Sequence, residues 1–251
     1  MSAGTGHTWT RCAQPLLGTL VEIGVSAPGA ERHVGVAAAF AVIREAQACL
    51  SRFESGSDIA TFNTLRCGER IEVRAITRQV LAAAHELRAA TAGAFDISLG
   101  SAPDGWALRG AELCKLSDAA QLDLGGIGKG HAVDLAVQTL RAHGVEAGWV
   151  NAGGDLRAFG DVDAPVQLRD EASGGVRAFA TLRDGAFATS HFGPGSRSRL
   201  AANARAAPPC AHASVAAPLC LWADALTKVV ALSGDTSHPL LARFDALAWL
   251  H

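Results

Sequence analysis

The sequence contains no tyrosine, one methionine and few charged residues. Its 251 residues are 49% hydrophobic, 18% charged and 6% aromatic. This composition excludes a disordered chain and is typical of a compact globular protein. The 22 basic and 24 acidic side chains give a formal net charge of −2, so no overall field favours nucleic acid or an acidic membrane surface. The length suits one large domain or two small ones, and we expect one.

Cysteine pairs and apolar leader segments are also missing. The six cysteines include no CxxC pair and lack the close spacing of a disulfide framework or zinc site, so we expect reduced thiols. The first 15 residues lack the apolar run and basic flank of a secretion signal, and Cys12 follows Thr-Arg and not the residues that precede a lipid-modified cysteine. No apolar run reaches the length of roughly 18 residues that is needed to span a bilayer. These absences favour a cytoplasmic protein without a transmembrane segment.

Strand-like and helix-like patterns alternate along the chain and predict an α+β fold. We expect a short N-terminal arm over residues 1–14, then a single domain over 15–251 in which helices flank a mixed β-sheet. Predicted strands cover 16–25, 70–73, 120–124, 148–151, 166–169, 176–182 and 186–189. Predicted helices cover 31–50, 76–91, about 132–140 and 223–232. Residues 51–69 and 191–209 are expected to be irregular connections.

A first glycine-rich turn lies in LDLGGIGKGHAVDLA, which begins at residue 122. The pattern indicates a strand, a tight turn and a helix. Glycines let main chain approach a ligand, and a helix N-terminus favours an anion, to which Lys129 would add a full charge. The spacing excludes both the P-loop and the GxGxxG fingerprint. The alternative is that these glycines only form a sharp corner.

A second glycine turn, VNAGGDLRAFG, occupies residues 150–160. It also follows a predicted strand and would expose the main-chain amides of residues 152–155. Two such turns could line one cleft and hold the phosphates of a nucleotide. The carboxylate of Asp155 then indicates either a metal ion or a hydrogen bond to a ligand hydroxyl. Capping of its own turn is the alternative.

These two segments resemble the paired signatures of the ApbE-type FAD:protein FMN transferases. Other stretches match the family in the same order: LLGT, SRFESGSDIATFN, GAFDISLG, FATS and ASVAAPLCLWADALTKVVAL. Together they cover most of the chain from Leu16 to about Gly234. The resemblance implies one ApbE-like domain that binds FAD, breaks its diphosphate with help from Mg²⁺, releases AMP and attaches FMN to a Ser or Thr of an acceptor flavoprotein.

Site roles follow from the resemblance, position by position. Asp155 and Asp224 are the expected catalytic residues. The expected metal site comprises the Gly126 carbonyl, Asp224 and the aligned positions Thr227 and Lys228. The expected FAD contacts are Leu17, Gly18, Thr19, Phe53, Ala94, Phe95, Asp96, Asp123, Lys129, Ala152, Gly153, Gly154, Ser190 and Ala201.

Several of these residues have simpler alternatives. Phe53 and Phe95 could be core aromatics, Asp96 a turn cap and Lys129 a surface charge. For Asp123 a structural role still requires a partner, because it lies in an apolar segment. His131, where the family commonly has Tyr, is expected to be a surface or capping residue.

Two motifs depart from the family pattern. The HIIDPRTG signature aligns with residues 200–207, where only the arginine remains and Leu200 replaces the histidine. Leucine transfers no proton, so His191 or His212 would have to substitute. ADALTK replaces ADALAT, so Lys228 stands four residues after Asp224 where the family has Thr. We hypothesise that Lys228 partly replaces the charge of the cation. Besides an active transferase, these losses leave open a flavin-binding paralogue without transfer and an FAD pyrophosphatase.

Overall fold

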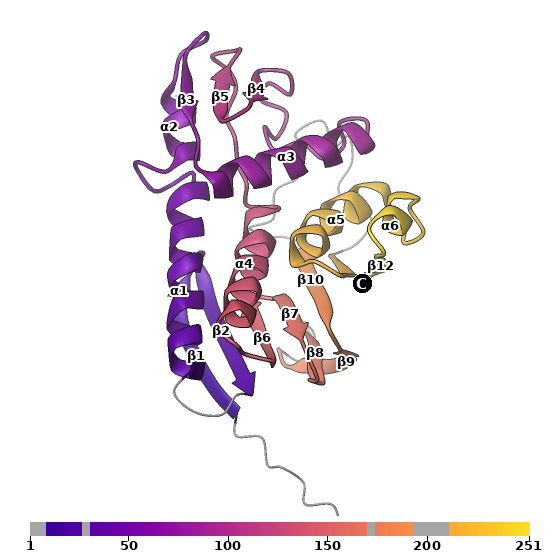
Figure 1. Cartoon of the computed structure of the whole chain (residues 1–251). Helices are drawn as coiled ribbons and strands as arrows, with labels where there is room; N and C mark the ends of the chain where they lie inside the picture. Colours follow the sequence, from indigo (N-terminus) through magenta and orange to yellow (C-terminus); the bar gives the residue numbers. More distant parts are fainter. Residues whose placement is uncertain (1–8, 27–30, 170–173, 193–210) are drawn as a thin grey trace, which may run out of the picture.

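The computed structural model describes residues 9–26, 31–169, 174–192 and 211–251 (Figure 1). The helices are α1 (Glu31–Leu50), α2 (Asp58–Thr64), α3 (Ala75–Ala90), α4 (Gly128–Ala142), α5 (Cys220–Ser233) and α6 (Leu240–Arg243). The strands are β1 (Trp9–Leu16), β2 (Thr19–Ser26), β3 (Arg70–Glu72), β4 (Trp106–Arg109), β5 (Glu112–Lys115), β6 (Ala147–Ala152), β7 (Asp155–Phe159), β8 (Ala164–Arg169), β9 (Val176–Leu182), β10 (Gly185–His191), β11 (His212–Ala217) and β12 (Leu247–Leu250).

A seven-stranded sheet in the order β1-β2-β6-β7-β10-β11-β12 forms the centre of the fold. Its strands come from both ends of the chain, and Val21 of β2 pairs with Ala152 of β6. That register places the β1–β2 turn and the β6–β7 turn at the same end of the sheet. Thr189 of β10 also reaches this end, since its carbonyl oxygen lies 4.0 Å from where a Cβ on Gly154 would stand.

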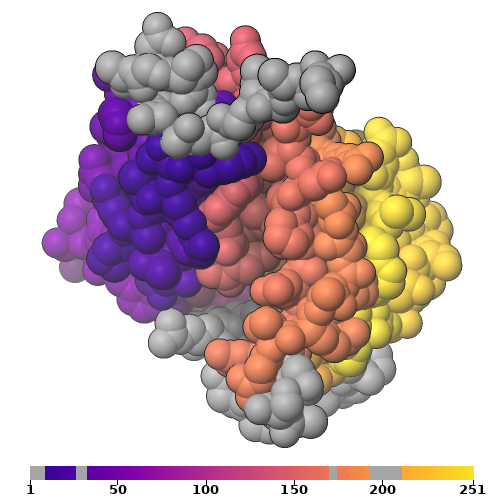
Figure 2. Space-filling model, turned by 90° about the horizontal axis from the view of Figure 1, so that it is seen from below, coloured from indigo at the N-terminus to yellow at the C-terminus, as the bar shows by residue number. Residues whose placement is uncertain are grey.

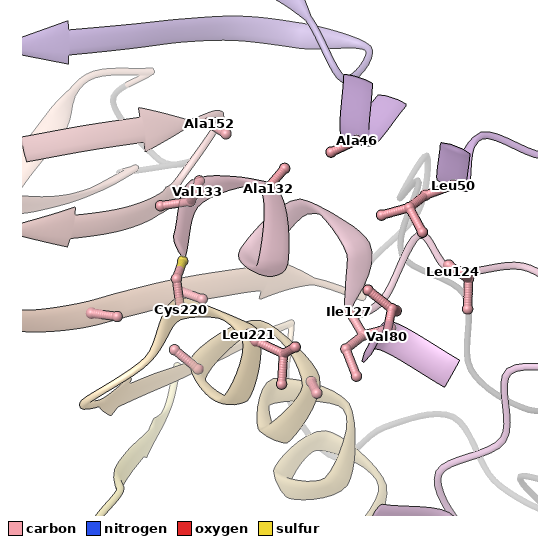
Figure 3. Packing of buried hydrophobic residues seen from close by; sticks show 14 of the residues in the cluster. Ala46, Leu50, Val80, Leu124, Ile127, Ala132, Val133, Ala152, Cys220 and Leu221 are labelled. Atoms are coloured by element: carbon pink, nitrogen blue, oxygen red, sulfur yellow. The ribbon is translucent and has the colours of Figure 1, made fainter. Parts of the chain in front are cut away.

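Helices α1, α4 and α5 pack side by side on one face of this sheet (Figure 1). Helix α4 lies in the middle, where Ala132 faces Ala46 of α1 and the start of α5 approaches from the other side (Figure 3). Small side chains at these contacts let the helices approach closely. The core therefore surrounds α4 and fixes where its N-terminus lies.

A second group of elements adjoins the N-terminal end of α4. It contains α2, α3 and a three-stranded sheet in the order β3-β5-β4 (Figure 1). Ser57 caps α2, because its hydroxyl accepts a hydrogen bond from the Ala60 N–H at 2.9 Å. The expectation of an irregular connection over residues 51–69 is therefore wrong for 58–64.

Figure 2 shows the molecule from below, from the indigo N-terminal residues through the orange segments to the yellow C-terminal segment. The two-stranded β8–β9 sheet packs on the face of the central sheet opposite the helices, and Val166 and Leu168 form a small apolar cluster with Phe187. A groove of about 880 Å³ runs between this hairpin and the sheet, lined by residues that include Trp149, Gly153, Gly154, His191 and His212.

The predicted α+β class with a single domain is confirmed, and α1, α3 and α5 lie where the sequence predicts helices. Every strand pair within the described residues is antiparallel, so the predicted mixture of parallel and antiparallel strands is not found there. The fold is mixed only in that it contains both helices and strands. The central sheet begins at Trp9, so residues 9–14 belong to β1 and not to an arm.

The predicted strand over residues 120–124 is wrong. The Asn63 side chain replaces a strand partner there: its Oδ1 accepts from the Leu122 N–H at 2.7 Å and its Nδ2 donates to the Leu122 carbonyl at 3.0 Å. Both main-chain groups of Leu122 are thereby satisfied outside a sheet. An apolar run beside a glycine turn is thus compatible with a buried loop.

Two sequence expectations concern thiols and membrane segments. The five cysteines within the described ranges (Cys12, Cys49, Cys67, Cys114 and Cys220) are free, as predicted. In those ranges one helical segment, His33–Leu50, is long and apolar enough to cross a membrane. Its Phe40 and Ile43 are buried in the core, as in the core helix of a globular domain, so the segment is weak support for a membrane span.

Candidate active site

The first glycine turn leads directly into α4, which begins at Gly128. The Gly130 N–H, in the first turn of the helix, donates to Asp224 Oδ2 of α5 at 3.2 Å. The anion at this helix N-terminus is therefore the protein's own carboxylate. Gly130 is required here, because a Cβ would stand 2.9 Å from Leu221 Cα and overlap the Cys220 carbonyl.

The second glycine turn is the tight connection between β6 and β7. Gly153 and Gly154 have φ of 62° and 106°, and the Gly154 N–H donates to Asn151 Oδ1 at 3.0 Å. A Cβ on Gly153 would stand 2.9 Å from Thr19 Cβ. The LLGT segment and the AGGD segment are therefore in contact, although Thr19 and Gly153 lie 134 residues apart in sequence.

Lys129 of α4 forms an ion pair with Asp155 of β7 and so joins the two turns. Asp155 is buried, and burial together with the nearby Asp224 charge raises its pKa to about 6 despite Lys129. Burial alone would lower the pKa of Lys129, but the Asp155 and Asp224 carboxylates raise it above its ordinary value. The two glycine turns thus meet at an electrostatically coupled pair.

A second ion pair, Lys228–Asp224, lies within α5 at a spacing of four residues. The Lys228 ammonium also donates to the Asp224 carbonyl at 2.9 Å and to Ser190 Oγ at 3.0 Å. Burial would raise the pKa of Asp224, but Lys129 and Lys228 hold it below its ordinary value. Ser190 in turn lies 2.8 Å from Thr227 Oγ1. These four side chains form one buried polar network.

The structure therefore brings one part of the predicted site together. Thr19, Gly126, Lys129, Gly153, Asp155, Ser190, Asp224, Thr227 and Lys228 gather from five separate segments around α4 and one end of the sheet. Gly126 belongs to the group because a Cβ there would stand 3.2 Å from Lys228 Cε. The roles of these residues stay predictions.

Other predicted contacts lie apart from this network. Phe95 is 5% exposed and belongs to the core, which is the simpler alternative. Asp96 accepts hydrogen bonds from the Ser98 and Gly100 N–H groups at 2.8 and 2.9 Å, as a turn cap does. Phe53 is 83% exposed beside a separate hollow of about 520 Å³.

Asp123 has the partner that the sequence requires. Its carboxylate lies 3.4 Å from Arg52 Nε and accepts from the Gly125 N–H at 2.8 Å. The Asp123 N–H donates to the Ile97 carbonyl at 2.8 Å, so the GAFD segment adjoins the first glycine turn. Asp123 thus stabilises the chain segment that leads into that turn.

The remaining predicted contacts occupy several places. Leu17 and Gly18 form the β1–β2 turn with φ of 55° and 69°, and the Leu17 N–H donates to Gln47 Oε1. Ala94 is exposed, whereas Ala152 is buried in the core. Ala201 and Leu200 lie outside the described residues.

Sequence reasoning missed several residues that shape this region. Asp134 of α4 accepts from Arg157 Nη1 at 2.6 Å and from the N–H groups of Cys220 and Leu221 at 2.9 Å each. It therefore holds the start of α5 against α4. His131 was expected at the surface but is 8% exposed, and burial lowers its pKa to about 4. An aspartate in an otherwise apolar helix face is the one sequence signal that could have revealed Asp134.

The two histidines considered as substitutes for the lost family histidine lie at the same sheet end. The rings of His191 and His212 stack with centroids 4.6 Å apart. Both line the outer groove together with Gly153 and Gly154. Two imidazole rings therefore lie beside the second glycine turn on that face.

The structure is an α+β domain in which two glycine turns meet beside paired lysines and aspartates. The sequence profile of the ApbE family matches residues 17–119 and 107–249. The chain belongs to the ApbE family.

Two relatives are named FAD:protein FMN transferase. The protein from Treponema pallidum (strain Nichols) is 27% identical over 205 residues, which is 66% of this chain and 57% of the relative. The protein from Rhodobacter capsulatus is 37% identical over 81 residues, which is 31% of this chain and 16% of the relative. The chain thus spans little more than half of the first relative and a small part of the second.

Solved structures share the fold. The flavin transferase ApbE from Vibrio cholerae superimposes with a TM-score of 0.81 at 20% identity, over 97% of this chain and 93% of that one. The flavinyl transferase ApbE from Pseudomonas stutzeri, in its apo form, gives a TM-score of 0.82 at 21% identity, over 96% and 90%. At these identities the similarity concerns the fold.

Proposed function

We propose that this protein is an FAD:protein FMN transferase. It would bind FAD, transfer FMN to a Ser or Thr hydroxyl of an acceptor flavoprotein and release AMP. The observation that carries the proposal is the meeting of the two glycine turns at the Lys129–Asp155 pair. The family and the names of the two relatives support it.

The reaction is a phosphoryl transfer from FAD to the acceptor hydroxyl. The acceptor oxygen bonds to the FMN phosphorus, the bond from that phosphorus to the bridging oxygen breaks, and AMP leaves with that oxygen. Such chemistry depends on positioning and charge stabilisation. Lys129 links the two glycine turns through its pair with Asp155 and would contact the diphosphate. His191 or His212 would accept the hydroxyl proton, and Asp155 and Asp224 would position the lysines.

The magnesium ion that the family resemblance implies does not fit these residues. Mg²⁺ requires a near-octahedral set of oxygens, and its usual protein ligands are carboxylates. Here the Asp224 carboxylate already bonds the Lys228 ammonium and the Gly130 N–H. No group of three or more His, Cys, Asp or Glu side chains suited to a metal occurs among the described residues. No step of the proposed reaction therefore passes through a metal.

Flavin binding without transfer is a second candidate, favoured by the Lys228–Asp224 pair at the expected metal position. One incubation distinguishes the candidates. The protein is mixed with FAD and a candidate acceptor, in EDTA and in Mg²⁺, and products are followed by mass spectrometry. A mass gain of FMN on the acceptor together with AMP supports the transferase. Bound FAD without AMP supports the second candidate, and AMP with free FMN and an unlabelled acceptor indicates a pyrophosphatase.

A further inference from the structure

The Lys228 side chain has the contacts of a bound cation. Its ammonium carries three N–H donors, and the structure supplies three acceptors: Asp224 Oδ1, the Asp224 carbonyl at 2.9 Å and Ser190 Oγ at 3.0 Å. Asp224 is 0% exposed and Lys228 is 6% exposed. A buried charge pair persists only with such complete hydrogen bonding.

The same side chain fills the space between Gly126 and Asp224. A Cβ on Gly126 would stand 3.2 Å from Lys228 Cε and 3.7 Å from Cδ. The aliphatic part of Lys228 therefore packs on the Gly126 main chain, while its ammonium reaches the carboxylate. A divalent ion placed between these two groups would overlap Lys228 and be repelled by its charge.

Thr227 is already engaged elsewhere. Its hydroxyl donates to the Asp224 carbonyl at 2.6 Å and lies 2.8 Å from Ser190 Oγ. It follows Asp224 by three residues and so bonds the main chain of its own helical turn. Of the groups that could ligate a metal, Ser190 and the Asp224 carboxylate thus bond the ammonium, and the Thr227 hydroxyl bonds Ser190 and main chain.

We infer that the Lys228 ammonium replaces the divalent cation in this protein, so that the chain takes up no metal ion between Gly126 and Asp224. The inference rests on the proposed function, because the family resemblance behind that function places the divalent ion between Gly126 and Asp224. It deepens that proposal, because the flavin dinucleotide would then bind to a site whose cations are lysines alone. The site would carry one positive charge fewer than the same site with a divalent ion and a neutral residue 228.

The test uses Mn²⁺ as the probe and electron paramagnetic resonance as the readout. Wild-type protein, Asp224→Asn, Lys228→Thr and Asp224→Asn/Lys228→Thr are titrated with Mn²⁺, with and without FAD. Thermal unfolding reports folding of each variant, and Lys228→Thr is purified in Mn²⁺ in case its bare Asp224 impairs folding. We expect no stoichiometric Mn²⁺ uptake by the wild type, one ion per chain in Lys228→Thr, and loss of that ion in the double variant.

Two results would overturn the inference: uptake of Mn²⁺ by the wild type, abolished by Asp224→Asn, or no uptake by a folded Lys228→Thr. FAD binding to the wild type, measured by flavin fluorescence, is expected to be equal within about twofold in EDTA and in Mg²⁺, since the resident cation is covalently part of the chain. An Mg²⁺ requirement would contradict the inference and leave the transferase intact. Absence of FAD binding under both conditions would contradict the proposed function, while the Mn²⁺ comparison still decides the role of Lys228.

Discussion

The main chain of Gly130 lies directly against Cys220, where the first turn of α4 crosses the first turn of α5. A Cβ at residue 130 would overlap the Cys220 carbonyl oxygen and stand 2.9 Å from Leu221 Cα. This close approach lets the Gly130 N–H reach Asp224 Oδ2 at 3.2 Å. Gly130 in the first glycine turn therefore also sets the distance between the two helices.

Gly130→Ala is expected to lower the free energy of unfolding by about 1–3 kcal/mol, because main-chain atoms of α5 must move. Gly128→Ala is the matched control in the same helical turn. A Cβ at residue 128 meets Leu50 Cδ1 at an ordinary 3.4 Å, so this variant should be neutral or gain up to about 1 kcal/mol of helix propensity. Urea unfolding of both variants measures the difference. Equal midpoints would contradict the close approach.

Asp134→Asn tests the joint between α4 and α5. The carboxylate is 5% exposed and holds Arg157 together with the first N–H groups of α5. Removing one partner of a buried pair leaves Arg157 with an uncompensated charge, so we expect a loss of about 3 kcal/mol or more. Asp184→Asn, which breaks the exposed pair with Arg141, should cost less than about 1 kcal/mol. Chemical denaturation of the two variants checks this ranking.

The sequence predicts the periodic elements well and the site only in outline. Helices such as α1 and α3 repeat their apolar residues over many turns, so the signal accumulates. Short antiparallel strands such as β4, β5, β11 and β12 carry four to six residues each and give little pattern. Their pairing depends on partners far along the chain, which no local window contains.

The sequence likewise predicts some features of the site and not others. The glycine turns indicate an anion, but the sequence does not reveal that Asp224 lies at the α4 N-terminus, 94 residues away. The spacing of four residues allows Lys228 to pair with Asp224 within one helix, and the two side chains do form an ion pair. The third contact, to Ser190, depends on β10 packing against α5. Local spacing predicts contacts within a helix, whereas tertiary packing determines the rest.

His131 and Asp155 should have opposite effects on the pH dependence of stability. The pKa of His131 is lowered to about 4 by burial, so the unfolded chain binds the extra proton and stability falls as pH falls from about 6.5 to 4. The pKa of Asp155 is raised to about 6, so the folded chain binds the extra proton and stability rises as pH falls from about 6 to 4.

His131→Phe removes one of these effects and keeps the shape of the buried side chain. Relative to the wild type, this variant should gain up to about 3 kcal/mol as pH falls from 6.5 to 4, by the conversion of about 1.4 kcal/mol per pKa unit. Unfolding free energies measured at several pH values provide the test. Asp155→Asn is the counterpart and should lose stability relative to the wild type over the same range. A pH-independent difference for His131→Phe would show that His131 ionises normally.

Lys129→Met tests whether the lysine between the two glycine turns holds the diphosphate. A hydrogen bond to a charged group contributes about 1.5–3 kcal/mol, so FAD affinity should fall at least about tenfold. ADP contains the diphosphate without the flavin and should lose affinity by a similar factor. Riboflavin, which has no phosphate, should bind both proteins equally. Arg141→Met removes an exposed cation from the other end of α4 and is the matched control, with no change expected for any of the three ligands. A loss of riboflavin affinity equal to that of FAD would place Lys129 at the flavin ring or in the fold. The diphosphate would then have to be held by the main-chain amides and the buried Lys228–Asp224 network.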